Sequence, residues 1–147
     1  EFLAYSHADL QCDPADIMTA YINIKKTENP QNVLIKGVRT GRNSIISTFF
    51  LILASVLFLK KFSDINAQPK VFHKSFLNKL KNPPNGFGLD LYVQYIALKS
   101  GMDMINIPVK FGDRRHGKSS WSSSIKSRII TIIGFIFYLI KLRIFGN

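Results

Sequence analysis

The feature that most constrains this chain is a pair of apolar runs, each bordered by basic residues. The runs are Ile45 to Leu59 and Ile129 to Ile140, and the basic residues beside them are Arg39, Arg42, Lys60, Lys61, Lys126, Arg128, Lys141 and Arg143. A helix needs about 20 apolar residues to cross a hydrocarbon core of roughly 30 Å, whereas the runs are about 15 and about 12 residues long. We therefore expect amphipathic helices that lie along a membrane interface, with Lys and Arg side chains reaching the headgroups. The alternative for each run is a buried core helix.

Composition narrows the class of protein and the kind of partner. The 147 residues suffice for one ordinary domain or a large piece of one, and a hydrophobic fraction of 46% with 20% charged residues excludes an intrinsically disordered chain. The net charge of +11 predicts an anionic partner: a membrane surface, a phosphorylated small molecule or nucleic acid. Nucleic acid is disfavoured because no recognisable binding motif accompanies the charges. The single cysteine, Cys12, excludes an internal disulfide.

Strand and helix signals alternate, which predicts an α/β fold. Asp13 and Pro14 supply a cap and a first helical residue for a helix from Pro14 to about Lys26. Short strands are expected at Val33 to Ile35 and at Met104 to Phe111, the second at a sheet edge because it contains a proline. A helix is expected at Leu89 to Ser100. The pattern of Glu1 to Tyr5 is that of a strand already under way, so we expect the chain to begin inside a longer protein.

Three polar side chains, His7, Asp9 and Gln11, follow the first expected strand. In extended backbone they point the same way, and a carboxylate beside an amide oxygen and an imidazole can hold a divalent cation at the carboxyl end of a strand. The alternative is that Asp9 is a turn or cap residue.

Two further charged positions are candidates for a functional site. Arg114, Arg115, His116 and Lys118 lie in a glycine- and serine-containing loop, where guanidinium groups match phosphate oxygens; a solvated charge run is the alternative. Asp90 begins a helix, where the helix dipole favours a carboxylate, so helix capping is the alternative to any role in a site.

A third segment carries polar residues at alternate positions. Its alternating members are expected to share one side of an extended stretch: Asp64, Asn66, Gln68 and Lys70. The alternative is that they satisfy backbone groups in a buried turn.

Taken in order, five segments resemble the family 2 glycosyltransferases of GT-A fold, especially the dolichyl- or polyprenyl-phosphate sugar transferase branch. The segments are Ala8 to Gln11 with Asp13-Pro14, Lys36 to Arg39 with Arg42, Ser63 to Phe72, Gly86 to Asp90, and Pro108-Val109 leading to Arg114 to Trp121. They cover most of the chain.

The resemblance implies a set of site residues. In the family, an Asp-x-Asp segment holds Mg²⁺ or Mn²⁺. Its second acid corresponds to Asp9, with Gln11 as a further ligand. His7 replaces the first acid, either as a metal ligand or as a residue that supports the ligands without contacting the metal. Asp90, Arg114 and Arg115 are the implied catalytic residues. The implied phosphate-binding residues are Arg39, Arg42, Arg115, Lys118 and Ser119, and the implied acceptor-pocket residues are Asp64, Gln68 and Lys70.

The resemblance also implies a fold and a function. Residues 1–124 would be the C-terminal part of a GT-A catalytic domain with a mixed sheet and an interface helix at about 44–62, and 125–147 a membrane-associated helix. The implied activity is inverting, metal-dependent transfer of a sugar from a nucleotide-sugar donor to polyprenyl phosphate or another lipid-linked or saccharide acceptor, in polysaccharide or glycolipid biosynthesis at the cytoplasmic face of the cell membrane. The family's nucleotide-base pocket normally lies upstream, so this fragment alone is not expected to suffice. The competing hypothesis is a non-catalytic module that binds anionic lipids.

Overall fold

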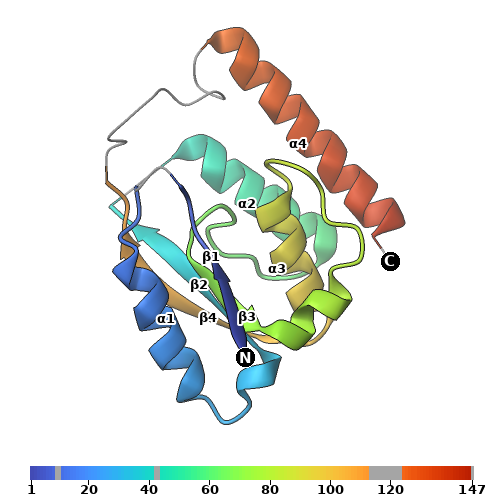
Figure 1. Ribbon diagram of the computed structural model, residues 1–147. Helices are drawn as coiled ribbons and strands as arrows, with labels where there is room; N and C mark the ends of the chain where they lie inside the picture. Colours follow the sequence, from blue (N-terminus) through green and yellow to red (C-terminus); the bar gives the residue numbers. More distant parts are fainter. Residues whose placement is uncertain (9–10, 42–43, 113–123, 147) are drawn as a thin grey trace.

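The computed structural model describes residues 1–8, 11–41, 44–112 and 124–146. Within these residues, four strands and four α-helices alternate with two short 3₁₀ helices (Figure 1). In chain order the elements are β1 (Phe2–Tyr5), α1 (Ala15–Lys25), η1 (Pro30–Asn32), β2 (Val33–Thr40), α2 (Ile45–Phe58), β3 (Lys70–His73), η2 (Lys74–Lys79), α3 (Leu89–Lys99), β4 (Asp103–Lys110) and α4 (Ile125–Phe145).

The strands form one mixed sheet in the order β1-β3-β2-β4. β3 is antiparallel to both of its neighbours, whereas β2 and β4 are parallel. Strands β1, β2 and β4 therefore run in one direction, and their carboxyl ends lie along the same side of the sheet, where β3 begins. The prediction of an α/β fold with a mixed sheet is confirmed, and so is the position of the proline-containing strand β4 at an edge.

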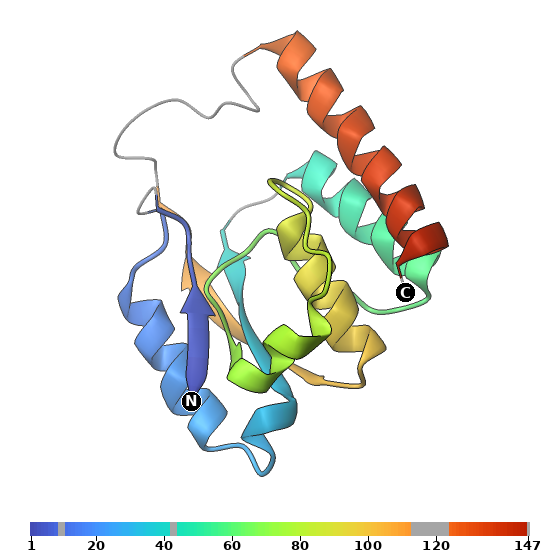
Figure 2. The ribbon, with the colours of Figure 1, turned by 45° about the vertical axis from the view of Figure 1, so that its right-hand side comes forward.

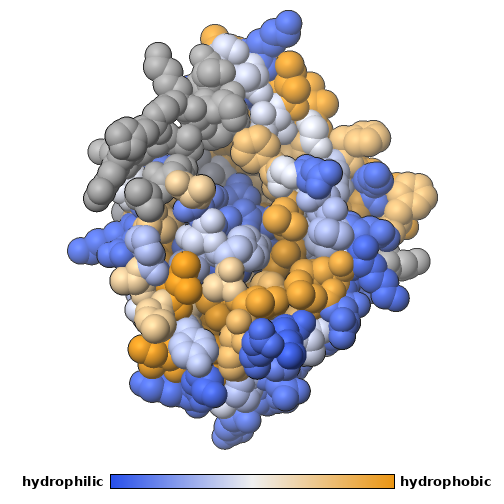
Figure 3. All heavy atoms as spheres, in the orientation of Figure 1, coloured by the Kyte–Doolittle hydropathy of each residue, from blue (hydrophilic) through white to orange (hydrophobic). Residues whose placement is uncertain are grey.

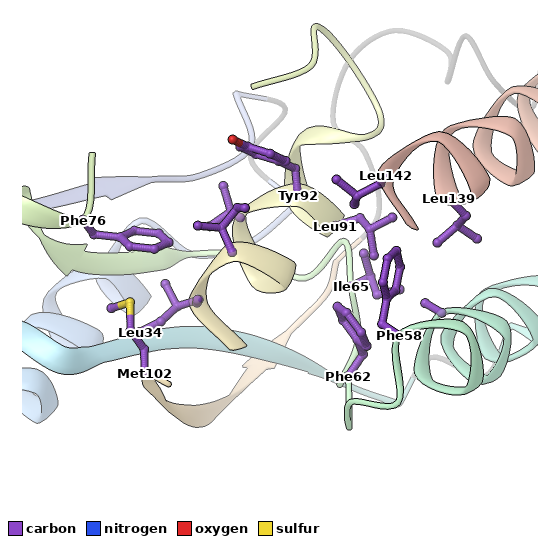
Figure 4. Close-up of a cluster of buried hydrophobic side chains, with 14 of the residues drawn as sticks. Leu34, Phe58, Phe62, Ile65, Phe76, Leu91, Tyr92, Met102, Leu139 and Leu142 are labelled. Atoms are coloured by element: carbon purple, nitrogen blue, oxygen red, sulfur yellow. The ribbon is translucent and has the colours of Figure 1, made fainter. Parts of the chain in front are cut away.

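Helices cover both faces of the sheet, with α1 on one face and α3 on the other (Figure 2). The alternation of side chains along β2 explains the two cores: Val33 and Ile35 pack with α1, and Leu34 packs with α3. Figure 4 shows the second core, in which Phe58 and Leu139 bring α2 and α4 against this layer.

Helices α2 and α4 lie side by side and each buries one side only. The rings of Phe50 and Phe135 meet with centroids 4.7 Å apart. Hydrophobic side chains remain exposed on the outer surface, as Figure 3 shows over α4. On α2 and its C-cap they are Ile45, Ile46, Phe49, Ile52, Val56 and Leu59, and on α4 Ile125, Ile129, Ile130, Ile133, Phe137, Ile140, Ile144 and Phe145. Among the described residues, no helix has the length and apolar character that crossing a membrane requires.

Most predicted element boundaries are close to those of the structure. Helix α1 begins at Ala15, whose backbone N–H donates to the Asp13 carboxylate at 2.9 Å. Helix α3 spans Leu89–Lys99, as its pattern indicated, and β2 continues to Thr40, beyond the predicted strand.

Two expectations of extended backbone were wrong. β1 ends at Tyr5, so His7 does not continue the strand. The segment from Ser63 to Pro69 is irregular and contains a turn, in which Ala67 N donates to Asp64 O and Asp64 has φ 21°; strand β3 begins only at Lys70. The physical reason is tertiary: buried side chains bind the carbonyls of this turn, as described below.

Candidate functional site

Asp90, in the first turn of α3, lies at the centre of a cluster at the edge where β1 ends and β3 begins. Lys70 forms an ion pair with its Oδ1 atom. Tyr5 donates its hydroxyl to the same oxygen at 3.1 Å, and Gln68 Nε2 donates to Oδ2 at 3.3 Å. The Lys70 side chain is fully buried and that of Asp90 is 14% exposed. Side chains from β1, from β3 and from the segment before β3 thus hold the carboxylate, which remains partly exposed.

Burial and the Asp90 charge fix the protonation of the neighbouring groups. Burial, then the carboxylate of Asp90, raises the pKa of Tyr5 well above its ordinary value, so the phenol remains a hydrogen-bond donor at all physiological pH values. Burial lowers the pKa of Lys70, although the attraction of Asp90 opposes this. The cluster therefore consists of donors directed at one carboxylate.

A second ion pair joins Arg39, near the end of β2, to Asp64. The Arg39 backbone N–H and its Nε both donate to Asp64 Oδ2 at 2.9 Å, and its guanidinium also contacts Oδ1. Burial alone would raise the pKa of Asp64, but the hydrogen bonds and charge of Arg39 outweigh it and hold that pKa below its usual range. The Arg39 guanidinium also lies 5.2 Å from the ring centroid of Phe111.

The segment after β1 leads from the Asp90 cluster toward the end of β4. The His7 ring lies 3.2 Å from Asn66 O. Gln11 and Gly112 are joined twice: Gln11 Nε2 donates to Gly112 O at 3.1 Å, and Gly112 N donates to Gln11 O at 2.8 Å. Chain segments about 100 residues apart in sequence thus meet at this edge of the sheet.

The structure brings together several predicted site residues and leaves others outside its described part. Gln68, Lys70 and Asp90 form one cluster, and Arg39 with Asp64 forms a neighbouring pair. The predicted residues outside the described ranges are Asp9, Arg42, Arg114, Arg115, His116, Lys118 and Ser119. Lys70 also donates to Ile65 O and Ala67 O, which confirms for this residue the alternative of a buried turn.

The residue types of the candidate metal ligands match the ions that the resemblance implies. Asp9 and Gln11 would offer a carboxylate and an amide oxygen, which are donor types that Mg²⁺ and Mn²⁺ accept. Gln11 is described, and its amide nitrogen is anchored on Gly112. Within the described ranges, no group of three or more His, Cys, Asp and Glu side chains is placed to hold a metal ion.

The sequence did not identify two residues of the site, Tyr5 and Lys36. Lys36 is fully buried in β2 and donates to carbonyls of the 63–64 turn. A lysine inside an otherwise apolar strand, between Ile35 and Gly37, was the available signal, because an unpaired lysine is almost never fully buried. Tyr5 gives no comparable signal, since a tyrosine at the end of a strand is ordinary.

Comparison of the chain with protein-family models, with curated proteins and with solved structures finds no match in any of the three.

Proposed function

We propose that this chain is part of the catalytic domain of an inverting, metal-dependent glycosyltransferase that transfers a sugar from a nucleotide-sugar to a lipid-linked or saccharide acceptor, polyprenyl phosphate included. The observation that carries the proposal is the convergence of Gln68, Lys70 and Asp90 at the edge where the parallel strands end. Ligands of open α/β sheets bind at this edge. The resemblance of five ordered segments to family 2 glycosyltransferases of GT-A fold supports the chemistry.

Asp90 is the proposed general base when the acceptor is a sugar hydroxyl. Its Oδ1 accepts from Tyr5 and Lys70, and its Oδ2 accepts from Gln68 at 3.3 Å. The carboxylate is therefore oriented, and Oδ2 is the atom we assign to the acceptor proton. A phosphate acceptor is already ionised at neutral pH and needs no base, so this role of Asp90 applies to a hydroxyl acceptor alone.

The donor diphosphate is assigned to the neighbourhood of Gln11 and Gly112. Mg²⁺ or Mn²⁺, held by Asp9 and Gln11, would supply charge neutralisation of the departing nucleotide diphosphate. The chain continues from Gly112 to Arg114, Arg115, Lys118 and Ser119, which we assign to binding phosphate oxygens and stabilising the leaving group. The contact between Gln11 and Gly112 supports this assignment, because it joins the two segments that would share one diphosphate.

Helices α2 and α4 are assigned to a membrane interface at its cytoplasmic face, the protein being peripheral or anchored. Both expose large hydrophobic side chains, for example Phe49 at 54% and Phe137 at 70%. Exposed basic residues border them: Lys60, Lys61, Lys126, Arg128, Lys141 and Arg143. Apolar side chains flanked by cations are the pattern of interfacial helices, which would bring the site to the plane of a lipid-linked acceptor.

The test is transfer of labelled sugar by the full-length protein to polyprenyl phosphate or saccharide acceptors in vesicles, across a panel of nucleotide-sugars and with Mg²⁺ or Mn²⁺. Asp90→Asn should lower transfer to a hydroxyl acceptor by about 10²–10⁴-fold. Asp103→Asn is the matched control, because Asp103 is exposed at the start of β4. No transfer from any donor, or equal rates in both variants with a hydroxyl acceptor, would count against the proposal.

The exposed faces of α2 and α4 also favour a second candidate, a non-catalytic module that binds anionic lipids. This candidate predicts that binding to acidic vesicles survives Asp9→Ala and Asp90→Ala, and that no metal-dependent nucleotide binding is found. The glycosyltransferase predicts nucleotide binding that requires Asp9. Calorimetric titration of the full-length protein with nucleotide-sugar, with and without metal, separates the two.

A further inference from the structure

Lys36 binds the backbone of the turn that follows α2. Its side chain is fully buried. Its Nζ atom donates to Ser63 O at 2.7 Å, to Asp64 O at 3.0 Å and to Gly37 O at 2.9 Å. An ammonium group has three N–H bonds and no acceptor, so three carbonyl oxygens match its full set of donors.

The two buried lysines of the site serve different purposes. Lys70 pairs with a carboxylate, that of Asp90. The hydrogen bonds of Lys36 go instead to uncharged oxygens, the carbonyls named above and the Ser63 hydroxyl at 3.4 Å. The free-energy cost of burying the Lys36 ammonium is thus offset mainly by hydrogen bonds to backbone carbonyls and not by a direct ion pair.

The turn that Lys36 holds determines where two other site residues lie. Asp64 adopts φ 21°, a conformation uncommon for residues other than glycine. Lys36 holds the carbonyl of Asp64, and Arg39, from the same strand, holds its carboxylate. Four residues later, Gln68 reaches Asp90. Two side chains of strand β2 therefore bind the beginning of the 64–68 segment, whose last residue contacts Asp90.

We propose that Lys36 is a positioning residue whose ammonium group fixes the backbone of Ser63 and Asp64, where the 64–67 turn begins, and thereby the placement of Asp64 and Gln68 at the site. The ordering of the turn follows from the hydrogen bonds alone. The consequence for acceptor binding rests on the proposed function, and the two are tested by separate measurements.

The first measurement is amide hydrogen exchange in Lys36→Ala. The reporter is the Ala67 amide, which donates to Asp64 O at 2.9 Å. Its exchange should accelerate about 10- to 100-fold, the factor expected for losing hydrogen bonds to a charged group. Methylammonium, which carries N–H donors, should restore protection, whereas tetramethylammonium, which has the charge but no donor, should not. Lys110→Ala, at an exposed lysine of β4, is the control and should leave exchange unchanged.

Unchanged exchange in Lys36→Ala, or equal rescue by both amines, would overturn the proposal. A second measurement uses the unsubstituted protein, so that it remains decisive if Lys36→Ala does not fold. With ¹⁵N-labelled lysines, at a pH below the Lys36 pKa of about 7, the Lys36 ammonium protons should exchange with water at least about tenfold more slowly than those of Lys110, because they are hydrogen-bonded and buried. Equal rates would contradict the assignment.

The functional consequence is measured by comparing the KM for the acceptor with the KM for the nucleotide-sugar. In Lys36→Ala the KM for the acceptor should rise about tenfold, while the KM for the nucleotide-sugar stays within about twofold. A rise in both, or in neither, would show that the turn does not position the acceptor side. Absence of transfer by the unsubstituted protein would refute the proposed function and leave the exchange result standing.

Discussion

At the scale of single residues, the Lys70–Asp90 ion pair is the interaction on which the site most depends. Lys70 is fully buried and also donates to Ile65 O and Ala67 O, so its ammonium satisfies a carboxylate and two backbone groups together. A buried pair contributes little net stability compared with an apolar replacement of both partners, but losing one partner leaves the other charge without compensation. This asymmetry makes the pair sensitive to single substitutions.

Lys70→Met is therefore expected to destabilise the protein by about 3–5 kcal/mol, measured by urea denaturation. The control is Lys74→Met, which removes a salt bridge to Glu1 between side chains that are 57% and 67% exposed. Exposed pairs contribute about 0–1 kcal/mol. Similar losses in the two variants would show that Lys70 is not held as described.

A pH-dependent prediction concerns Lys36. Burial, reinforced by the charge of Lys70, lowers its pKa from 10.5 to about 7, although Asp64 and Asp90 oppose the shift and Arg39 adds to it. Because the folded-state pKa is the lower one, the unfolded chain binds more protons between pH 7 and 10.5. The contribution of Lys36 to the free energy of unfolding therefore rises with pH across this window.

The measurement is urea denaturation at several pH values from about 7 to 10 in the unsubstituted protein and in Lys36→Met. The variant should lack the part of the rise that Lys36 supplies. Parallel pH profiles in the two proteins would contradict the lowered pKa.

At the scale of elements, β2 and the turn before β3 approach so closely that only glycine fits at position 37. A Cβ atom there would lie 2.3 Å from Gln68 O, and Gly37 N donates to Pro69 O at 2.9 Å. The obstacle is backbone, which cannot move aside as a flexible side chain can. The close approach of β2 to the Gln68–Pro69 backbone thus requires a residue without a Cβ atom at position 37.

Gly37→Ala should destabilise the protein by about 1–3 kcal/mol or more in thermal or urea denaturation. Gly134→Ala is the matched control. Gly134 lies in α4, where an added Cβ meets no atom within 4 Å, and the helix should gain up to about 1 kcal/mol. A neutral Gly37→Ala would show that the two segments are farther apart.

The accuracy of the sequence-based predictions also differs between elements. Helices α1 and α3 were predicted within about a residue, because caps and periodic apolar residues are local signals. The turn at 63–69 was wrongly predicted as extended, since its carbonyls are bound by Lys36, Lys70 and Gln94 from other elements. Gln68, Lys70 and Asp90 were predicted as site residues, but their meeting at one carboxylate depends on β3 starting at the edge where β1 ends. No local pattern encodes that arrangement.

At the scale of the whole molecule, charge and exposed hydrophobic surface combine on α2 and α4. Helix α1 also exposes large hydrophobic side chains, but among the described residues these are three, Met18, Tyr21 and Ile22, fewer than on α2 or α4. The whole protein is also strongly basic, with a net charge of +11. Both features favour an anionic bilayer over neutral lipid.

Phe137→Asp should weaken binding to anionic vesicles by about tenfold or more in a flotation assay, because it replaces an inserted ring with a negative charge. Ile22→Asp is the control: Ile22 lies on α1, is 49% exposed and is outside the α2–α4 surface. Binding that falls equally in both variants, or in neither, would show that α2 and α4 do not form the lipid-facing surface.

The connection between α2 and the turn at Ser63 is short. Helix α2 ends at Phe58, Phe62 is anchored by its N–H on the Ser55 hydroxyl at 3.3 Å, and Ser63 is bound by Lys36. With consecutive Cα atoms only about 3.8 Å apart, this tether has little slack. A displacement of α2 would therefore shift Ser63 and Asp64 as well, and if α2 rests on a membrane as proposed, membrane binding would be coupled to the geometry of the site.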